Sequence, residues 1–513
     1  MSSAITLEDL DEAAVARLAE LIALKVQPGD TIALNGNLGA GKTTFARALI
    51  RALLQDADAE VPSPTFPILQ PYDTDRIAIA HFDLYRIGSV EDLDELGFDD
   101  AIAGGLVIIE WPERAEDALP CDRLEITFNA GLTNTRRDLT LLGVGTFGPK
   151  LERLAAIHGF LQTAPGSTKV QSIAYLQGDA SQRTYARIAT GTGSFILMDS
   201  PRMADGPPVR DGLPYSRIAH LAEDVRPFVA IAAALEASGL SVPHVYSADL
   251  EQGLLLLEDL GDQTFHRALR DGVAQAHLWP AAVDVLVALR SQPIPHHLPL
   301  HDGIQHALPR FDRAALEIEL ALLLDWYWPE VKGGPPSDSV RRTFLDLWTP
   351  ALDFLMAVPA GIFLRDFHSP NLFWLPDRPG IRNVGVIDFQ DALAGPWALD
   401  LVSLLQDARV DVPEHLEAGE LERYIGLIAA REAGFDAERF RKTYAIFGAQ
   451  RNTRLIGLWV RLLRRDAKPG YLQHMARTWH YLARNLRHPE LAALKAWYDE
   501  HFPEDVRLQP IVA

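Results

Sequence analysis

The stretch GNLGAGKT, residues 36–43, decides the fold of the first part of the chain. Its spacing is G-x-x-x-x-G-K-[S/T], and it lies between the apolar run TIALNG (31–36) and the helix-like run TFARALIRALL (44–54). A glycine-rich turn of this kind lets backbone N–H groups surround phosphate oxygens, and the helix N-terminus adds partial positive charge. The stretch therefore predicts a nucleoside-triphosphate site, with a lysine on the phosphates and a hydroxyl on Mg²⁺. Its residues are Gly36, Gly39, Gly41, Lys42, Thr43 and Thr44.

The sequence around this loop alternates strand-like and helix-like runs. RIAIAHFDLY (76–85) and GLVIIEW (105–111) are apolar and of strand length. The alternation predicts an α/β P-loop NTPase fold with a mainly parallel sheet. Asp83 and Glu110 stand near the ends of these two runs, where a carboxylate can hold the metal ion or its water. We therefore take Asp83 as a catalytic candidate and Glu110 as a metal ligand.

Four further motifs support a resemblance. SPTF (63–66), HFDLYR (81–86), ELGFDD (95–100) and IEWPER (109–114) follow the phosphate loop in order. With it they make residues 5–142 resemble the TsaE family of small bacterial ATPases. The resemblance implies an ATPase subunit for forming N6-threonylcarbamoyladenosine in tRNA, with TsaD-like and TsaB-like partners and only indirect contact with tRNA. It also implies ATP with Mg²⁺, Trp111 beside the nucleotide and Thr65 in a switch-like segment.

A second site is predicted much later in the chain. FLRDFHSPNLFW (363–374) contains D-x-x-x-x-N, and the apolar run in VGVIDFQDA (384–392) ends at another aspartate. Phosphoryl transfer needs a base for the acceptor hydroxyl and oxygen ligands for Mg²⁺. Asp366 is the predicted base, and Asn371 and Asp388 are the predicted metal ligands. His368 stands where a cationic or donating group could contact the γ-phosphate.

Upstream segments complete the predicted kinase-like site. LQGDASQRTYARI (176–188) lies between two strand-like runs and predicts a hairpin over the phosphates, and LLLLEDLGD (254–262) suits a hinge at the adenine. The nucleotide-binding residues predicted there are Arg183, Arg187, Glu258, Asp259 and Leu260, the last three through backbone groups. With the mostly helical sequence after Arg226, this predicts an α+β protein-kinase-like bilobal fold of the aminoglycoside phosphotransferase type.

Residues 150–495 resemble the aminoglycoside-phosphotransferase-like kinases, especially the AmgK group of anomeric sugar kinases. The segments that carry this resemblance are GDASQRTYAR, FILMDSP, LLLEDLGD, LRDFHSPNL, VIDFQDALAGPWALDLVSLLQD and QRNTRLIG. The resemblance implies transfer of the ATP γ-phosphate to the C1 hydroxyl of N-acetylmuramate or N-acetylglucosamine, in cell-wall recycling. It places Arg451 and Asn452 on the acceptor side.

Two positions depart from the general kinase pattern. Leu364 replaces the usual first histidine of the catalytic loop, and Met198 stands at or near the usual phosphate-binding lysine. Arg183 or Arg187 could supply the missing charge. The alternatives are a kinase for another small-molecule hydroxyl and a non-catalytic pseudokinase scaffold.

Length and glycine content suggest how the two parts are joined. The chain has 513 residues, enough for several domains. GVGTFGP (143–149) is the predicted linker between an ATPase domain at 1–142 and a kinase domain at 150–513. Because their pathways share little besides ATP, we expect the two activities to be independent.

Charge and composition exclude several classes of protein. The net charge is -21, and residues 1–150 carry 25 acidic against 12 basic residues, which argues against direct gripping of nucleic acid. The single cysteine, Cys121, excludes an internal disulfide. The acidic N-terminus does not look like a signal peptide, and no run is long enough for a membrane span. These features predict a cytoplasmic protein with no membrane contact.

Three other patterns are ambiguous. GVGTFG (143–148) matches a dinucleotide-binding spacing, but no suitable acidic residue follows. HHLPLHD (296–302) is rich in histidine but lacks the helical spacing of metal ligands. WYW (326–328) favours core packing, with a wall for a sugar as the alternative.

Overall fold

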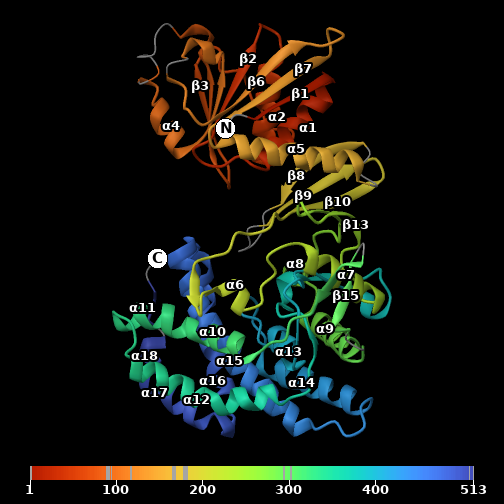
Figure 1. The fold of residues 1–513 in the computed structure, drawn as a ribbon, viewed down its shortest axis with the longest axis vertical. Coiled ribbons are helices and arrows are strands. Elements are labelled where there is room, and N and C mark those ends of the chain that lie inside the picture. Colours follow the sequence, from red (N-terminus) through yellow and green to blue (C-terminus); the bar gives the residue numbers. More distant parts are fainter. Residues whose placement is uncertain are drawn as a thin grey trace. The chain divides into compact units, whose positions relative to one another are not determined.

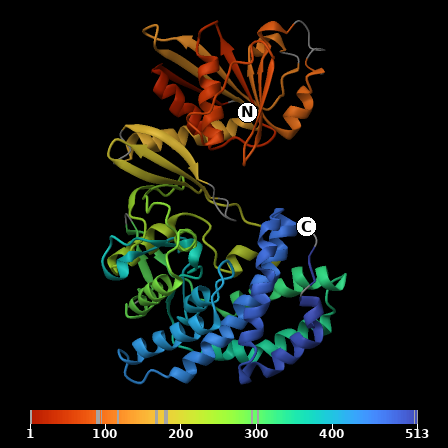
Figure 2. The same ribbon diagram turned by 180° about the vertical axis from the view of Figure 1, so that it is seen from behind.

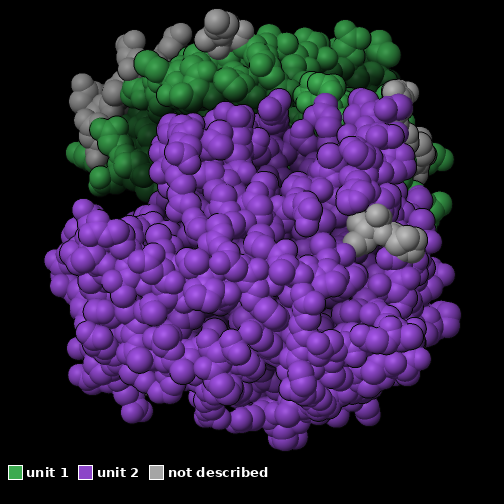
Figure 3. Space-filling model, turned by 60° about the horizontal axis from the view of Figure 1, so that its bottom comes forward, with its two compact units in different colours: residues 1–201, 245–259 green, residues 202–244, 260–513 purple. Residues whose placement is uncertain are grey.

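A computed structural model describes residues 3–87, 93, 95–115, 118–164, 169–176, 183–292, 295–300, 303–507 and 509–511. The chain forms two compact units, coloured separately in Figure 3. The first comprises Met1–Pro201 and Val245–Asp259, and the second comprises Arg202–His244 and Leu260–Ala513. The first unit therefore combines the ATPase-like sequence with the strand-rich start of the kinase-like sequence. The division at 1–142, 143–149 and 150–513 stays a prediction from the sequence.

A seven-stranded sheet dominates the N-terminal part of the first unit, in the order β1-β7-β6-β2-β5-β4-β3 (Figure 1). Its strands are β1 (Ser3–Leu10), β2 (Thr31–Gly36), β3 (Leu69–Asp73), β4 (Ala78–Asp83), β5 (Gly105–Glu110), β6 (Arg123–Ala130) and β7 (Arg137–Val144). β2 pairs in parallel with β5 and β6, and β4 pairs in parallel with β5. The strands β1, β3 and β7 pair antiparallel with their neighbours. This mixed sheet with parallel central strands confirms the predicted α/β fold.

Amphipathic helices cover this sheet. They are α1 (Glu12–Ala23), α2 (Lys42–Leu54), α4 (Phe98–Gly104) and α5 (Phe147–Thr163). The Asp11 carboxylate caps α1 by accepting the Ala14 N–H at 2.8 Å. Apolar residues of α1 recur every three or four positions, so one stripe of the helix is buried against the sheet. The helix α2 begins directly after the phosphate loop, as its sequence predicts.

The predicted linker 143–149 contains a tight turn between two regular elements. The strand β7 ends at Val144 and α5 begins at Phe147. Gly145 has φ +61°, and a Cβ atom added there would lie 1.7 Å from Oδ1 of Asp122. The same oxygen accepts the Thr146 N–H at 2.8 Å. Gly145 therefore allows this turn to approach Asp122 closely.

A five-stranded antiparallel sheet follows, in the order β13-β14-β10-β9-β8. We call it the small-lobe sheet. Its strands are β8 (Val170–Leu176), β9 (Thr184–Thr190), β10 (Gly193–Asp199), β13 (Val245–Asp249) and β14 (Leu254–Glu258). It confirms the predicted small sheet of a kinase-like fold. The tip of the predicted phosphate hairpin, residues 177–182, lies outside the described residues. Figures 1 and 2 show α5 between this sheet and the seven-stranded sheet.

The second unit is mostly helical, as predicted. Its helices are α6 (Tyr215–Ile218), α7 (Arg226–Ala237), α8 (Phe265–Arg270), α9 (Gln275–Arg290), α10 (Arg313–Leu322), α11 (Trp328–Lys332), α12 (Asp338–Met356), α13 (Ala398–Leu405), α14 (Glu414–Ala429), α15 (Ala437–Asp466), α16 (Met475–Asn485), α17 (Ala492–His501) and α18 (Glu504–Arg507). A π-helical turn, Leu323–Tyr327, connects α10 to α11. Tyr327 and Trp328 are buried against Phe502, which confirms core packing for these two aromatic residues.

Short strand pairs complete the second unit. They are β11 (Pro208–Arg210) with β12 (Leu213–Pro214), β15 (His297–Pro299) with β16 (Gln305–Ala307), β17 (Gly361–Phe363) with β20 (Leu393–Gly395), and β18 (Leu372–Trp374) with β19 (Val384–Val386). The strand β17 leads into the predicted catalytic loop, and β19 ends two residues before Asp388. Within the described ranges, no helix is both long and apolar enough to cross a membrane.

Candidate nucleotide and catalytic sites

The phosphate loop lies between the C-terminal end of β2 and the start of α2. Gly36, Gly39 and Gly41 have φ values of +145°, +75° and +108°, a region that residues with a Cβ rarely adopt. At Gly36 a Cβ would also lie 2.9 Å from the Phe128 carbonyl oxygen. Glycine is therefore required by both the turn and the neighbouring strand β6. The position at a helix N-terminus is suited to binding an anion.

Lys42 is folded back on this loop and is buried. Its Nζ donates to the carbonyl oxygens of Gly36 at 2.5 Å and Asn37 at 3.1 Å, and lies 3.5 Å from the centre of the Trp111 ring. Burial lowers the pKa of the Lys42 ammonium, while Glu110, Glu113 and Asp83 act in the opposite direction. A buried ammonium held by carbonyl oxygens and an aromatic face fits a triphosphate, which supplies a charged partner.

Two hydroxyl–carboxylate pairs lie at the ends of neighbouring strands. The Thr43 hydroxyl donates to Oε2 of Glu110 at 2.8 Å, and the Thr65 hydroxyl donates to Oδ2 of Asp83 at 2.7 Å. Asp83 and Glu110 are paired in register on the parallel strands β4 and β5, and both are buried. Carboxylate and hydroxyl oxygens are ligands that Mg²⁺ prefers. The structure thus brings together Lys42, Thr43, Thr65, Asp83, Glu110 and Trp111, and this donor set fits a magnesium nucleotide.

His81 belongs to the same group and was not predicted from the sequence. Its Nε2 lies 3.0 Å from Oε1 of Glu110, and its ring is fully buried. It therefore orients the carboxylate that contacts Thr43. The feature of the sequence that could have identified His81 is a polar residue at an inward-facing position of the apolar run RIAIAHFDLY.

The predicted catalytic loop of the second unit is held in place by a buried aspartate. The N–H groups of Leu364 and Arg365 donate to Oδ2 and Oδ1 of Asp400 on α13, at 2.6 Å and 2.8 Å. Arg365 has φ +73°, an uncommon conformation for a residue with a side chain. These two hydrogen bonds fix the backbone that presents Asp366. Burial raises the pKa of Asp400 to about 7, although the two N–H donors act to lower it.

The three predicted phosphoryl-transfer residues meet beyond this point. The Asn371 side-chain amide donates to the Asp366 carbonyl oxygen at 3.0 Å and to Oδ2 of Asp388 at 3.3 Å. Gln390 donates to the other carboxylate oxygen of Asp388 at 2.8 Å. Asp388 has φ +60°, a left-handed backbone conformation that residues with a side chain rarely adopt. The amide and carboxylate oxygens of Asn371 and Asp388 fit Mg²⁺.

His368 is buried beside this loop. Burial and the nearby Arg409 hold the pKa of the His368 imidazole well below its usual value, so the neutral ring is expected at pH 7. Its Nε2 lies 3.1 Å from Nη1 of Arg409 and must accept that hydrogen bond, because a guanidinium can only donate. A neutral His368 ring corrects the prediction that this residue is a cation near the γ-phosphate. The alternative role, as a hydrogen-bond donor through Nδ1, stays a prediction.

The two predicted acceptor-side residues on α15 are buried inside the helical lobe. Asn452 donates to Oε1 of Gln406 at 2.8 Å and to the Gly448 carbonyl oxygen at 2.7 Å. Arg451 donates to the Gln406 carbonyl oxygen at 3.3 Å, and burial followed by repulsion from Arg454 lowers its pKa to about 10. Asn452 is fully buried, so the structure places it in the core rather than on a substrate surface.

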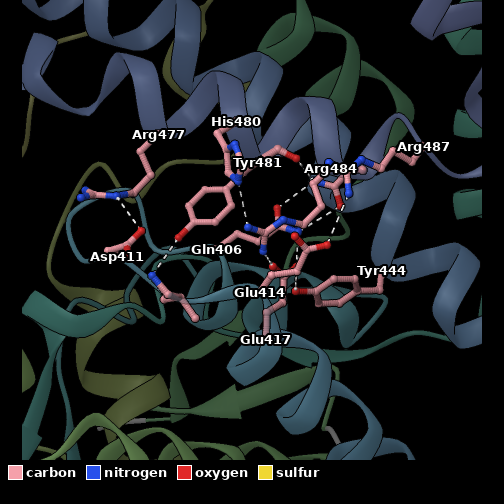
Figure 4. A network of polar contacts seen from close by, with 12 residues as sticks. Gln406, Asp411, Glu414, Glu417, Tyr444, Arg477, His480, Tyr481, Arg484 and Arg487 are labelled. Carbon is pink, nitrogen blue, oxygen red and sulfur yellow. Dashed lines mark hydrogen bonds and ion pairs between the residues drawn. The ribbon is translucent and has the colours of Figure 1, made fainter.

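The network around Gln406 explains this burial (Figure 4). Gln406 donates to Oε1 of Glu417 at 2.8 Å, and the same carboxylate receives the Tyr444 hydroxyl at 2.9 Å and an ion pair from Arg484. Buried polar groups need such partners. The network fixes α13, α14, α15 and α16 relative to one another.

Arg454 faces the catalytic loop instead. Its Nη2 lies 3.9 Å from Oδ1 of Asp366, and its Nη1 donates to Oε1 of the buried Glu319 at 3.1 Å. Burial alone would raise the pKa of Glu319, but Arg454 and Arg365 hold it below the usual value. The sequence contains Arg454 in the quoted QRNTRLIG segment, but helix geometry was needed to distinguish it from Arg451.

The small-lobe sheet carries the remaining predicted residues. Arg187 pairs with Asp259, at 2.7 Å from its Nε to Oδ2, so its guanidinium lies at the end of β14. The predicted contact of Arg187 with the phosphates stays a prediction. Arg183 lies one residue before β9, and Glu258 is the last residue of β14. Met198 is buried and pairs in register with Tyr185 and Leu255, so a methionine occupies the interior of β10.

The histidine-rich loop does not form a metal centre in the residues that can be placed. Groups of three or more potential ligands are absent from the described part of the chain. His301 and Asp302 lie outside the described residues.

Comparison with known proteins matches both parts of the chain. Residues 10–138 match the family described as "Threonylcarbamoyl adenosine biosynthesis protein TsaE", and residues 172–440 match the "Phosphotransferase enzyme family". An N-acetylmuramate/N-acetylglucosamine kinase of Caulobacter vibrioides is 38% identical over 365 residues, which cover 69% of this chain and 98% of that protein. A kinase of the same name from Pseudomonas aeruginosa is 35% identical over 325 residues, covering 62% and 84%.

The N-terminal part has its own relatives. A tRNA threonylcarbamoyladenosine biosynthesis protein TsaE of Rickettsia conorii is 38% identical over 149 residues, which cover 29% of this chain and 82% of that protein. The two sets of matches agree with the phosphate loop and the kinase-like loop described above. The chain therefore belongs to the TsaE family in its N-terminal part and to the phosphotransferase enzyme family in its C-terminal part.

Proposed function

We propose that the C-terminal part transfers the γ-phosphoryl group of ATP to the C1 hydroxyl of N-acetylmuramate or N-acetylglucosamine. The observation that carries this is the Asn371 amide, which contacts both the backbone carbonyl oxygen of Asp366 and the carboxylate of Asp388. The names of the kinase relatives supply the class of sugar. The product is a sugar 1-phosphate, which suits cell-wall sugar recycling.

Each residue has a defined task in this reaction. The side chain of Asp366 is 28% exposed and accepts the proton of the C1 hydroxyl as its oxygen attacks the γ-phosphorus. The bond from the γ-phosphorus to the β,γ-bridging oxygen breaks, and ADP leaves. Asn371 and Asp388 would hold Mg²⁺, which neutralises charge on the phosphates. Arg454 adds positive charge beside the reacting oxygen.

For the N-terminal part we propose ATP hydrolysis in support of N6-threonylcarbamoyladenosine formation in tRNA. Lys42 would bind the phosphates, and Thr43 with Glu110 would hold Mg²⁺. The acidic charge of this part supports action through TsaD-like and TsaB-like proteins, with tRNA contacted indirectly. A cytoplasmic location belongs to the same proposal, because both reactions use ATP and one of them acts on tRNA.

Met198 favours a second candidate function for the C-terminal part. Without a lysine at this position, the small lobe could bind nucleotide weakly and serve as a pseudokinase scaffold, or the acceptor could be another small-molecule hydroxyl. The intact Asp366, Asn371 and Asp388 favour catalysis over the scaffold.

The test is direct detection of the product. The full chain is incubated with ATP, Mg²⁺ and each amino sugar, and ³¹P NMR follows the phosphorylated product. A resonance coupled to the anomeric proton is expected for at least one of the two sugars. Nucleotide binding without transfer to either sugar would contradict the proposal and favour the second candidate.

A further inference from the structure

One hydrophobic core is shared by the two sheets of the first unit. One face of the small-lobe sheet contributes its buried aliphatic residues to this core: Ile173, Ala186, Ile188, Leu197, Leu254 and Leu256. The same core contains Ile22 of α1, Leu49 of α2 and Leu154 of α5. The connecting helix α5 lies between the sheets in both ribbon views (Figures 1 and 2). This face of the small lobe is therefore covered by α1 and α2 of the ATPase-like part and by the connecting helix α5.

Polar groups of the ATPase-like part also contact the edge strand β8. Oε2 of Glu20 accepts the Ile173 N–H at 2.8 Å, and Nε2 of Gln55 donates to the Tyr175 carbonyl oxygen at 2.9 Å. The Arg76 guanidinium lies 4.5 Å from the centre of the Tyr175 ring. Backbone groups of an edge strand need partners other than a neighbouring strand. Helices α1 and α2 supply such partners here.

A buried ion-pair cluster also joins the small-lobe sheet to the ATPase-like part. Asp199 ends β10, is 2% exposed, and pairs with both Lys25 and Arg153. Lys25 follows α1 by two residues, and Arg153 lies on α5. A buried carboxylate without cationic partners is strongly unfavourable. The last residue of β10 therefore takes one of its two cationic partners from the ATPase-like part.

The strands joined in this way are those that carry the predicted kinase nucleotide contacts. β8 and β9 flank the predicted phosphate hairpin, and β14 leads to the predicted hinge at Glu258. Along β9, Arg187 stands next to residues that are buried in the shared core, and so does Met198 along β10. Because side chains alternate between faces, these two residues lie on the face opposite that core. Loosening the shared face would displace both.

We propose that the ATPase-like part is an obligatory structural support for the kinase small lobe. The small-lobe sheet and the seven-stranded sheet then unfold as one cooperative unit, and the kinase part binds ATP poorly when their contact is weakened. The kinase relative from Caulobacter vibrioides is covered almost completely by 365 residues, too few for both parts, so this dependence is a property of the fused chain. It concerns the fold and does not require ATP hydrolysis at the phosphate loop.

The first test is native-state hydrogen exchange of the full chain in rising denaturant. We expect the slowest-exchanging amides of both sheets, in β2 and β5 and in β9 and β10, to exchange through the same opening reaction. Their exchange rates should then show the same dependence on denaturant. The proposal is overturned if β9 and β10 exchange through a separate opening while β2 and β5 stay protected. This readout needs no sugar and no catalysis, so it stays decisive if the proposed kinase function fails.

The second test removes the lysine of the ATPase-like part. Lys25→Met leaves Asp199 with Arg153 alone, and exchange of the β10 and β14 amides should accelerate by about tenfold or more. The KM for ATP in sugar phosphorylation, which rests on the proposed function, should rise about fivefold or more because the loosened strands carry the predicted nucleotide contacts. Lys25→Arg keeps the charge and should restore both values.

The matched control uses a similar cluster in the second unit. Asp499 on α17 pairs with Lys495 and Arg507 but is 45% exposed. Because an exposed ion pair contributes little, Lys495→Met should leave both the small-lobe exchange and the KM for ATP unchanged. Unchanged exchange and KM in Lys25→Met would contradict the proposal, as would the same effect in both variants.

Discussion

Arg454 and Asp366 are neighbours in space although 88 positions separate them in the sequence, and Nη2 of the arginine lies 3.9 Å from Oδ1 of the aspartate. The other end of the guanidinium is held by Glu319, which also receives hydrogen bonds from Arg365 and Gln450. The arginine is therefore fixed on α15 before any substrate binds. Its charge stands beside the group to which we assign proton acceptance.

Arg454→Met should lower kcat for sugar phosphorylation by about 10- to 100-fold, because a fixed charge beside the reacting oxygen is lost. The KM for ATP should change little, since Arg454 is on the acceptor side of the proposed site. Steady-state kinetics with both substrates varied separate these effects. Arg464→Met is the control, because Arg464 pairs with Glu330 at the surface. Equal kcat values in the two variants would refute the role of Arg454.

Lys42→Met should abolish ATP hydrolysis by the N-terminal part, because the ammonium that contacts the loop carbonyls is also the proposed phosphate ligand. Sugar phosphorylation should stay within about twofold of the wild type, since the proposed link between the parts is structural. Hydrolysis is measured with TsaD-like and TsaB-like proteins present and sugar absent. Loss of sugar phosphorylation in a folded Lys42→Met protein would disprove the independence of the two reactions.

The stability of the chain should depend on the protonation of Asp400. Burial raises the pKa of this carboxyl to about 7, above the value of 3.8 expected in the unfolded chain. The folded state therefore binds the extra proton between about pH 4 and pH 7, and the resulting stabilisation is lost as pH rises through this window. One such group changes the free energy of unfolding by up to about 1.4 kcal/mol per pH unit.

Denaturant unfolding from pH 4.5 to pH 8 measures this dependence. Asp400→Asn cannot titrate, so the free energy of unfolding should fall less steeply with pH in this variant than in the wild type. Equal slopes would show that Asp400 stays ionised throughout. The variant also keeps an oxygen for one of the two N–H groups of the catalytic loop, which limits its effect on folding.

Gly145→Ala should destabilise the first unit by more than its backbone conformation alone explains. The left-handed φ of +61° costs about 1–2 kcal/mol for alanine, and the new Cβ would also meet Oδ1 of Asp122. Gly97→Ala is the matched control, since Gly97 has φ +69° with no atom within 4 Å of the added Cβ. Chemical denaturation compares the two variants. Equal losses would show that the turn yields without strain.

Motifs confined to one loop could be predicted from the sequence, because neighbouring residues stay together in any fold. The phosphate loop and the D-x-x-x-x-N loop are of this kind, and the structure brings their predicted residues together. Asp83 and Glu110 were also predictable, since each ends an apolar run and parallel strands end at one edge.

Choices that depend on side-chain direction could not be made from the sequence. Arg451 and Arg454 are three residues apart on α15, yet Arg451 contacts Gln406 and Arg454 contacts Glu319. The pairing of Arg187 with Asp259, 72 positions later, also depends on the register of the small-lobe sheet. The segment 143–149 has the composition of a linker, but the contact of Gly145 with Asp122 depends on a residue 23 positions earlier.

The most direct measurement of the central claim is the rate of phosphoryl transfer to the C1 hydroxyl in Asp366→Asn. Asparagine keeps the shape of the side chain but cannot accept the hydroxyl proton, so kcat should fall by about 100-fold or more while nucleotide binding is retained. Asp377→Asn, at an exposed position six residues beyond Asn371, should retain wild-type kcat. Sugar 1-phosphate formation at an undiminished rate in Asp366→Asn would contradict the account.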